Sequence, residues 1–168
     1  RLPVDAGQSI PDTDRTRELK MQHVTRERIV QAARGWIGTP YHHQASLRHV
    51  GTDCLGLVRG VWRELYGDDA ETPPAYSRDW AEASGSEAML EAARRHLEPK
   101  PVAAVSAGDV LVFRLRAGFI AKHAAIVTGP SAMVHAIENA PVAEVALTNW
   151  WRRRIAGAFQ FPDVSEGS

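Results

Sequence analysis

The sequence contains only one cysteine, Cys54, among its 168 residues. A single thiol cannot form a disulfide within the chain, and it cannot supply the paired cysteines of a CxxC zinc site. We therefore expect no metal ion and no other cofactor, and stability has to come from packing. A chain of this length with 44% hydrophobic residues can form one core, but it is too short for two comfortable domains.

The chain also lacks long apolar runs and any excess of charge. No segment approaches the roughly 18 apolar residues of a membrane-spanning helix, and the first 24 residues lack the apolar stretch of a secretory signal. We therefore expect no membrane insertion, and synthesis in the cytoplasm without a signal peptide. Twenty Lys and Arg residues balance twenty Asp and Glu residues, so the formal net charge is zero. Without a basic footprint, no direct nucleic-acid binding is expected.

Helical patterns dominate the first half of the chain. Residues 1–24 show no apolar period and are predicted to form an extended N-terminal arm. Apolar residues at helical spacing predict a first helix within residues 25–38 and a second over residues 54–66. An alanine-rich third helix is expected over residues 86–97, ended by two prolines that follow it closely.

Short apolar segments separated by turn residues dominate the second half. They predict five strands, at residues 110–113, 123–127, 133–137, 143–147 and 155–159. Helices first and strands later predict an α+β domain over residues 25–162, with the N-terminal helices packed on an antiparallel sheet of about five strands. Residues 163–168 are predicted to form a flexible C-terminal tail.

Cys54 lies where a loop turns into the second predicted helix. At such a position the backbone N–H groups and the helix dipole favour a thiolate, which is the nucleophilic form of cysteine. A lone cysteine is more often an inert core residue than a nucleophile. However, Asp53 before it and Gly56 after it are typical of a tight turn entering a helix, which favours the reactive interpretation.

Two histidines could complete a catalytic group with this cysteine. His123 and His135 each occur in an apolar strand-like segment, twelve residues apart, with the turn residues Gly129-Pro130-Ser131 between them. This spacing suits adjacent antiparallel strands that set the two imidazoles side by side. Either histidine alone is more often a structural side chain, but together with Cys54 they predict a Cys/His/His constellation.

A second histidine cluster offers an alternative. His42, His43 and His49 could bind a metal ion or compete for the role of catalytic base. They occur on a polar loop without a matching carboxylate or thiolate pattern, so a solvated loop is the favoured interpretation.

Several of these segments together resemble the NlpC/p60 family of bacterial cell-wall cysteine peptidases. The resemblance covers roughly residues 25–161, and within the family it is greatest to the small peptidases of phage tails and gene transfer agents. The segments that carry it are Trp36-Ile37-Gly38-Thr39-Pro40-Tyr41, Asp53-Cys54-Leu55-Gly56-Leu57-Val58-Arg59-Gly60, Gly108-Asp109-Val110-Leu111-Val112-Phe113, His123-Ala124-Ala125-Ile126-Val127, Met133-Val134-His135-Ala136 and Trp150-Trp151-Arg152-Arg153-Arg154-Ile155-Ala156-Gly157.

The resemblance implies a papain-like fold and a set of roles. It implies that Cys54 is the nucleophile, His123 the base that activates it, and His135 the group that orients His123. It also implies that Tyr41 and Asp53 line the substrate groove, with Asp53 binding the free amino terminus of a stem peptide. An Asp before a helix is equally an ordinary N-cap.

The implied activity is hydrolysis of peptide bonds in peptidoglycan stem peptides, most often after D-glutamate and before a diamino acid. The phage-like similarity implies a place in a tail particle that opens the bacterial cell wall for DNA delivery, with tail hub or baseplate proteins as partners. The arm of residues 1–24 and the run Arg152-Arg153-Arg154 are then candidate docking elements. A structural tail component with little activity, and a thiol amidase or acyltransferase on the same scaffold, remain alternatives.

Overall fold

The structure is a computed structural model, which describes residues 24–73 and 87–166. The predicted arm therefore lies outside the described residues except for Val24. The helices are α2 (Arg26–Arg34), α3 (Cys54–Tyr66), α4 (Ala88–His96), the short α5 (Asn149–Arg152) and the 3-10 helix η1 (Val102–Ala104). The strands are β1 (Ser46–Leu47), β2 (Gly51–Thr52), β3 (Glu98–Lys100), β4 (Val110–Phe113), β5 (His123–Gly129), β6 (Ala132–His135), β7 (Ala143–Ala146) and β8 (Ile155–Gln160).

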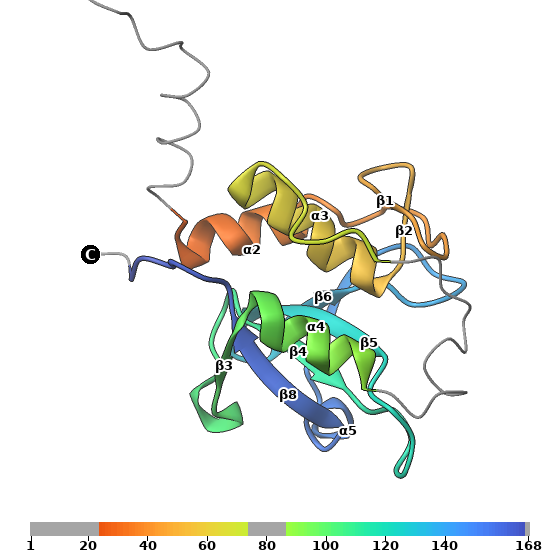
Figure 1. Ribbon diagram of the computed structural model, residues 1–168. Coiled ribbons are helices and arrows are strands. Elements are labelled where there is room, and N and C mark those ends of the chain that lie inside the picture. Colours follow the sequence, from red (N-terminus) through yellow and green to blue (C-terminus); the bar gives the residue numbers. More distant parts are fainter. Residues whose placement is uncertain (1–23, 74–86, 167–168) are drawn as a thin grey trace, which may run out of the picture.

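The last six strands form one antiparallel sheet in the order β3-β8-β4-β5-β6-β7 (Figure 1). This confirms the predicted α+β class, with six strands rather than about five. The additional strand is β3, at the two prolines that were expected only to end the third helix. β3 pairs with β8 alone, and an edge strand tolerates proline because its outward-facing positions need no N–H donor.

One face of this sheet is covered by α2, α3 and α4, and it carries the larger core. Residues of β4 and β5 on this face include Val110, Val112 and Ala124. The turn that follows α2 approaches α3 closely: a Cβ atom at Gly60 of α3 would overlap the indole of Trp36. Packing of Trp36 against α3 therefore requires glycine at position 60.

The opposite face of the sheet carries a second, smaller core. Its buried residues are Leu111, Phe113, Ala125, Val127, Met133, Leu147 and Ala158, with Trp151 packed against them. Because successive side chains of a strand point to opposite faces, His123 and His135 share this face with Ala125 and Met133. Among the described residues, no helix is long and apolar enough to cross a membrane.

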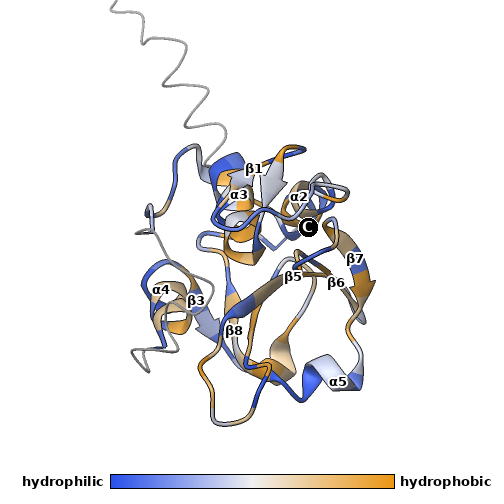
Figure 2. Cartoon of the chain, turned by 90° about the vertical axis from the view of Figure 1, so that its right-hand side faces the viewer, coloured by the Kyte–Doolittle hydropathy of each residue, from blue (hydrophilic) through white to orange (hydrophobic). Residues whose placement is uncertain are grey.

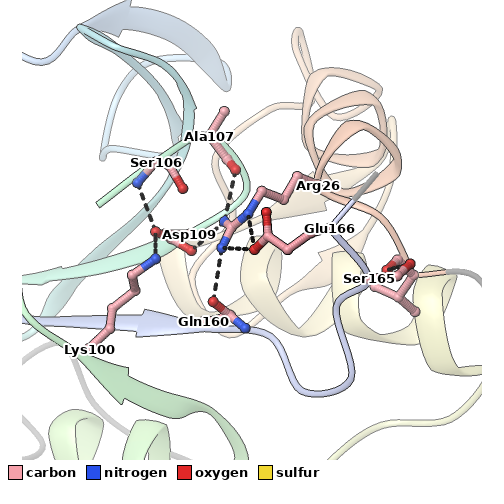
Figure 3. Close-up of polar contacts among 9 residues, drawn as sticks. Arg26, Lys100, Ser106, Ala107, Asp109, Gln160, Ser165 and Glu166 are labelled. Atoms are coloured by element: carbon pink, nitrogen blue, oxygen red, sulfur yellow. Dashed lines mark hydrogen bonds and ion pairs between the residues drawn. The ribbon is translucent and has the colours of Figure 1, made fainter. Parts of the chain in front are cut away.

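A buried carboxylate ties the start and the end of the domain together (Figure 3). Asp109, fully buried before β4, accepts hydrogen bonds from Arg26 at 2.9 Å and from Lys100 at 2.6 Å. The backbone N–H of Ser106 donates to the same carboxylate at 2.8 Å. Arg26 also donates to Gln160 of β8 at 2.9 Å. The side chains of Asp109 and Arg26 together thus join α2, β3, the start of β4 and β8.

Residues 163–166, the described part of the predicted tail, lie beside the start of α2. The N–H of Ser165 donates to the carbonyl of Val24 at 2.9 Å, and Ser165 forms a parallel bridge with Thr25. Glu166 lies 3.4 Å from the guanidinium of Arg26. These contacts place the described end of the chain against its described beginning.

Candidate functional site

The turn before α3 is fixed by the carboxylate of Asp53. This buried N-cap accepts hydrogen bonds from the backbone N–H of Gly56 at 2.7 Å and of Gln44 at 2.8 Å. A Cβ atom at Gly56 would overlap the carbonyl of Ala45, so glycine is required there. The predicted turn is confirmed, and it places Cys54 as the first residue of α3.

The thiol of Cys54 lies against the backbone at the start of β5. Its Sγ donates to the carbonyl of Lys122 at 3.7 Å, and the N–H of Ala124 also interacts with the sulfur. These two groups flank His123 in the chain. The structure therefore brings the predicted nucleophile to the peptide units on both sides of the predicted base.

Burial, rather than the helix dipole, controls the protonation of this thiol. Desolvation, together with the negative charge of Asp53, raises the pKa of Cys54 to about 12. The expectation of a resting thiolate is therefore wrong for this structure. Backbone N–H groups stabilise the charged form, but they do not offset the loss of water around the sulfur.

The two predicted histidines form a pair. His135 lies opposite Ala125 in the β5–β6 register, so it is a diagonal neighbour of His123 on one face of the sheet. Nε2 of His123 lies 3.0 Å from Nδ1 of His135, and both rings are buried. Burial and the neighbouring His135 lower the pKa of His123 to about 3, and burial also lowers the pKa of His135. Both imidazoles are therefore neutral near pH 7.

Trp151 packs against both imidazoles and was not predicted as part of the site. Its ring centroid lies 5.4 Å from that of His123 and 5.3 Å from that of His135. Phe113 closes a further side of His123 at 5.8 Å. A tryptophan pair before the last strand was visible in the sequence. The residues that Trp151 contacts follow only from the strand order, which places β8 beside β4.

Tyr41 and the loop histidines lie before the Asp53 turn. Tyr41 forms an isolated bridge with Thr52 and is partly buried against the larger core, as is Cys54. His42 and His49 are exposed. In residues 24–73 and 87–166, no three His, Cys, Asp or Glu side chains are grouped so that they could hold a metal ion.

Comparison with known proteins identifies the family of the chain. The family model described as the NlpC/P60 family matches residues 38–160. The chain belongs to the NlpC/P60 family. This NlpC/P60 domain is 25% identical over 138 residues to the gamma-DL-glutamyl hydrolase of Bacillus subtilis (strain 168). That match covers 82% of the chain but only 30% of the relative's length.

Solved structures of the family share the fold of this NlpC/P60 domain. The NlpC/p60 domain of the peptidoglycan hydrolase SagA aligns with a TM-score of 0.57 and 24% identity, covering 82% of this chain and all of that one. An NlpC/P60 family protein from Bacillus cereus ATCC 10987 aligns with a TM-score of 0.61 and 17% identity, covering 84% of this chain and 41% of that one. The predicted family and fold are therefore confirmed.

An apolar cavity of about 280 Å³ lies between α3 and α4 of the NlpC/P60 domain. Leu55, Trp62 and Met89 line it from the helices, and Val112 and Ala124 line it from the sheet. Both strand residues belong to the helix-covered face. The sheet therefore separates this cavity from the imidazole pair.

The buried imidazole of His123 predicts loss of stability in acid. Its pKa falls from an ordinary 6.5 to about 3 on folding, so between these values the unfolded chain binds more protons. The contribution of the neutral His123 to the free energy of unfolding is fully present above pH 6.5 and is lost as the pH falls from 6.5 towards 3. At pH 5 we expect the free energy of unfolding to be about 2 kcal/mol lower than at pH 7 because of this group.

Urea denaturation at pH 7 and at pH 5 measures this difference. We expect the difference to shrink by about 2 kcal/mol in His123→Phe, which keeps an aromatic ring at the position. His42→Asn, at an exposed position, serves as the control and keeps the wild-type difference. Equal pH dependence in wild type and His123→Phe would contradict the buried neutral imidazole.

Proposed function

We propose that this domain is a cysteine peptidase that hydrolyses peptide bonds in peptidoglycan stem peptides. The observation that carries the proposal is the position of the Cys54 thiol at the backbone of His123, whose ring in turn contacts His135 at 3.0 Å. A thiol, a base and a group that orients the base are the parts needed for nucleophilic acyl transfer. Membership of the NlpC/P60 family supports the substrate class, since the SagA domain is named as part of a peptidoglycan hydrolase.

In the proposed reaction, sulfur attacks the carbonyl carbon of the scissile amide while His123 accepts the thiol proton. Because burial keeps the thiol and the imidazole neutral at rest, this proton transfer accompanies attack rather than preceding it. The C–N bond then breaks, and His123 returns the proton to the leaving amine. Water hydrolyses the resulting thioester, giving a carboxylate and restoring the thiol. The backbone N–H of Cys54, at the N-terminus of α3, is positioned to stabilise the oxyanion.

His135 is proposed to select the tautomer of His123. When Nε2–H of His123 donates to Nδ1 of His135, Nδ1 of His123 is left unprotonated and is the nitrogen proposed to accept the thiol proton. Trp151 and Phe113 restrict rotation of the His123 ring. We therefore place His135 as a positioning residue.

This role predicts that His135→Ala lowers kcat on a soluble stem peptide about 100-fold while KM changes little. His135→Asn offers a carbonyl oxygen for the same hydrogen bond, and we expect it to recover part of the loss. Steady-state kinetics of both variants and of wild type provide the measurement. A fall in activity that tracks only loss of folded protein, with no difference between Asn and Ala, would contradict the positioning role.

Tyr41 and Asp53 are proposed to line the substrate groove next to the nucleophile. Asp53 is already an N-cap, so its carboxylate would bind the amino terminus of a stem peptide while still holding the turn. We propose cleavage after D-glutamate and before the diamino acid. The relative from Bacillus subtilis, named as a gamma-DL-glutamyl hydrolase, supports a γ-glutamyl bond.

The proposed setting is the tail of a phage-like particle, where local opening of the cell wall admits DNA. The similarity of the Cys54 run and of the segment Trp150–Gly157 to small peptidases of phage tails and gene transfer agents supports it. Hub or baseplate proteins of the tail are the proposed partners.

Mass spectrometry of fragments released from purified murein tests the activity and names the bond. We expect wild-type protein to release fragments with new D-glutamate and diamino-acid ends. Folded wild-type protein that releases nothing from murein would contradict the proposal and favour a structural role.

A further inference from the structure

One end of the sheet carries a cluster of basic residues that the proposed chemistry does not use. They come from the loop between β4 and β5 and from α5 with the start of β8, and we call them the basic end surface: Arg114, Arg116, Lys122, Arg152, Arg153 and Arg154. Residues 113–122 and 145–162 contain no Asp or Glu, although the whole chain has a net charge of zero. Positive charge is therefore concentrated at this end.

The two segments lie side by side. The N–H of Arg114 donates to the carbonyl of Arg154 at 2.8 Å, which continues the β4–β8 pairing beyond Phe113. Figure 1 places the β4–β5 loop and α5 at the lower end of the molecule, and in Figure 2 α5 is mostly pale to blue. The two segments are therefore neighbours at one end of the sheet.

Two exposed aromatic rings belong to this surface. Phe119 is 42% exposed and Trp150 is 45% exposed. The guanidinium of Arg116 lies 4.2 Å from the ring centre of Phe119, and that of Arg154 lies 3.7 Å from the ring of Trp150. Each pair presents a flat apolar ring together with a cation.

Internal partners neutralise only part of this charge. Arg114 is paired with Glu87 at 2.6 Å, which also accepts from the N–H of Ala121. Arg152 donates to the uncharged carbonyl of Pro130 at 2.8 Å. Arg152 and Arg153 are both exposed. The surface therefore keeps an excess of positive charge that faces solvent.

The basic end surface borders the candidate active site along two routes. The β4–β5 loop leads directly into Lys122, whose carbonyl accepts from the thiol of Cys54. Trp150 contacts Trp151 with ring centroids 4.8 Å apart, and Trp151 packs on His123 and His135. A polymer held on this surface would therefore lie next to the reacting groups.

We propose that the basic end surface binds murein itself, outside the stem peptide that is cut. The inference rests on the proposed peptidase function. Murein combines free peptide carboxylates, which suit guanidinium groups, with sugar rings, whose apolar faces stack on exposed aromatic side chains. The surface offers both guanidinium groups and exposed aromatic rings, and its Lys122 contacts the proposed nucleophile through its carbonyl. It would therefore hold the insoluble polymer while one stem peptide enters the site.

Binding to purified, insoluble murein tests this proposal without turnover. Cosedimentation of the Cys54→Ala protein is compared with the same protein carrying Arg153→Glu, Trp150→Ala or Arg34→Glu. Arg34 is an exposed arginine in the last turn of α2, so its reversal is a matched change of charge elsewhere. We expect Arg153→Glu to weaken binding on the order of tenfold and added salt to weaken it further, with Arg34→Glu close to the parent.

The murein can also be changed instead of the protein. Converting its free carboxylates to amides should remove the difference between Arg153→Glu and the parent, because the guanidinium then has no anion to bind. Equal weakening by Arg153→Glu and Arg34→Glu, or unchanged binding in both, would overturn the proposal. So would preferential binding of DNA by the parent. Failure of wild-type protein to cut murein would instead contradict the proposed peptidase function. Because cosedimentation measures binding and mass spectrometry measures cleavage, the two failures can be distinguished.

Discussion

Cys54→Ala is expected to lower the rate of stem-peptide release from purified murein by at least about 10⁴-fold, without unfolding the domain. In the proposed reaction the sulfur, which contacts the carbonyl of Lys122 next to His123, supplies the attacking electron pair and forms the acyl intermediate. Circular dichroism and the midpoint of urea unfolding check that the fold persists. Release rates measured by mass spectrometry at equal protein concentration give the loss.

Cys54→Ser is the matched control for this substitution. It keeps a hydroxyl that donates to the carbonyl of Lys122, but the hydroxyl is far less nucleophilic than a thiol, so we expect it to be nearly as inactive as the alanine variant. Residual activity of Cys54→Ala above about one per cent of wild type would show that the cysteine is not the nucleophile.

The largest expected loss of stability follows from Asp109→Ala. The substitution leaves the guanidinium of Arg26 and the ammonium of Lys100, which are both largely buried, without their shared carboxylate. It also removes the acceptor for the N–H of Ser106. Unpairing buried charge costs about 3–5 kcal/mol, and we expect about 3 kcal/mol because both cations keep some contact with water. Urea denaturation near pH 7 measures the change.

Two further variants separate charge from shape in this cluster. Asp109→Asn keeps the size and one acceptor oxygen, so we expect a smaller loss than for alanine. The side chain of Glu166 is 80% exposed and is only the outer partner of Arg26. Glu166→Gln should therefore change the free energy of unfolding by less than about 0.5 kcal/mol. Similar losses for Asp109→Ala and Glu166→Gln would contradict a buried ionic link.

Local turn chemistry explains which features the sequence predicted. The Asp53 cap and the close approach at Gly56 are encoded within a few residues, so the start of α3 at Cys54 was predictable. The spacing of His123 and His135 likewise predicted their pairing across a tight turn. Two strands that follow one another with a short turn between them pair antiparallel, so the local sequence pattern is sufficient to predict it.

Features that depend on distant segments were not predictable in the same way. The contact of Trp151 with both imidazoles follows from the insertion of β8 between β3 and β4, which no local pattern specifies. The neutral thiol of Cys54 has the same origin. A helix N-terminus is visible in the sequence, but desolvation by β5 is a property of the assembled core.

The position of β8 in the sheet also sets the order in which the domain can be completed during translation. β3 and β4 are separated in the sheet by β8, which the ribosome makes after both of them, so a nascent chain ending before residue 155 has a gap between them. Such a chain already contains the thiol and both imidazoles, but β4 still lacks its second neighbour. Folding of the sheet is therefore expected to wait until nearly the whole domain has emerged from the ribosome.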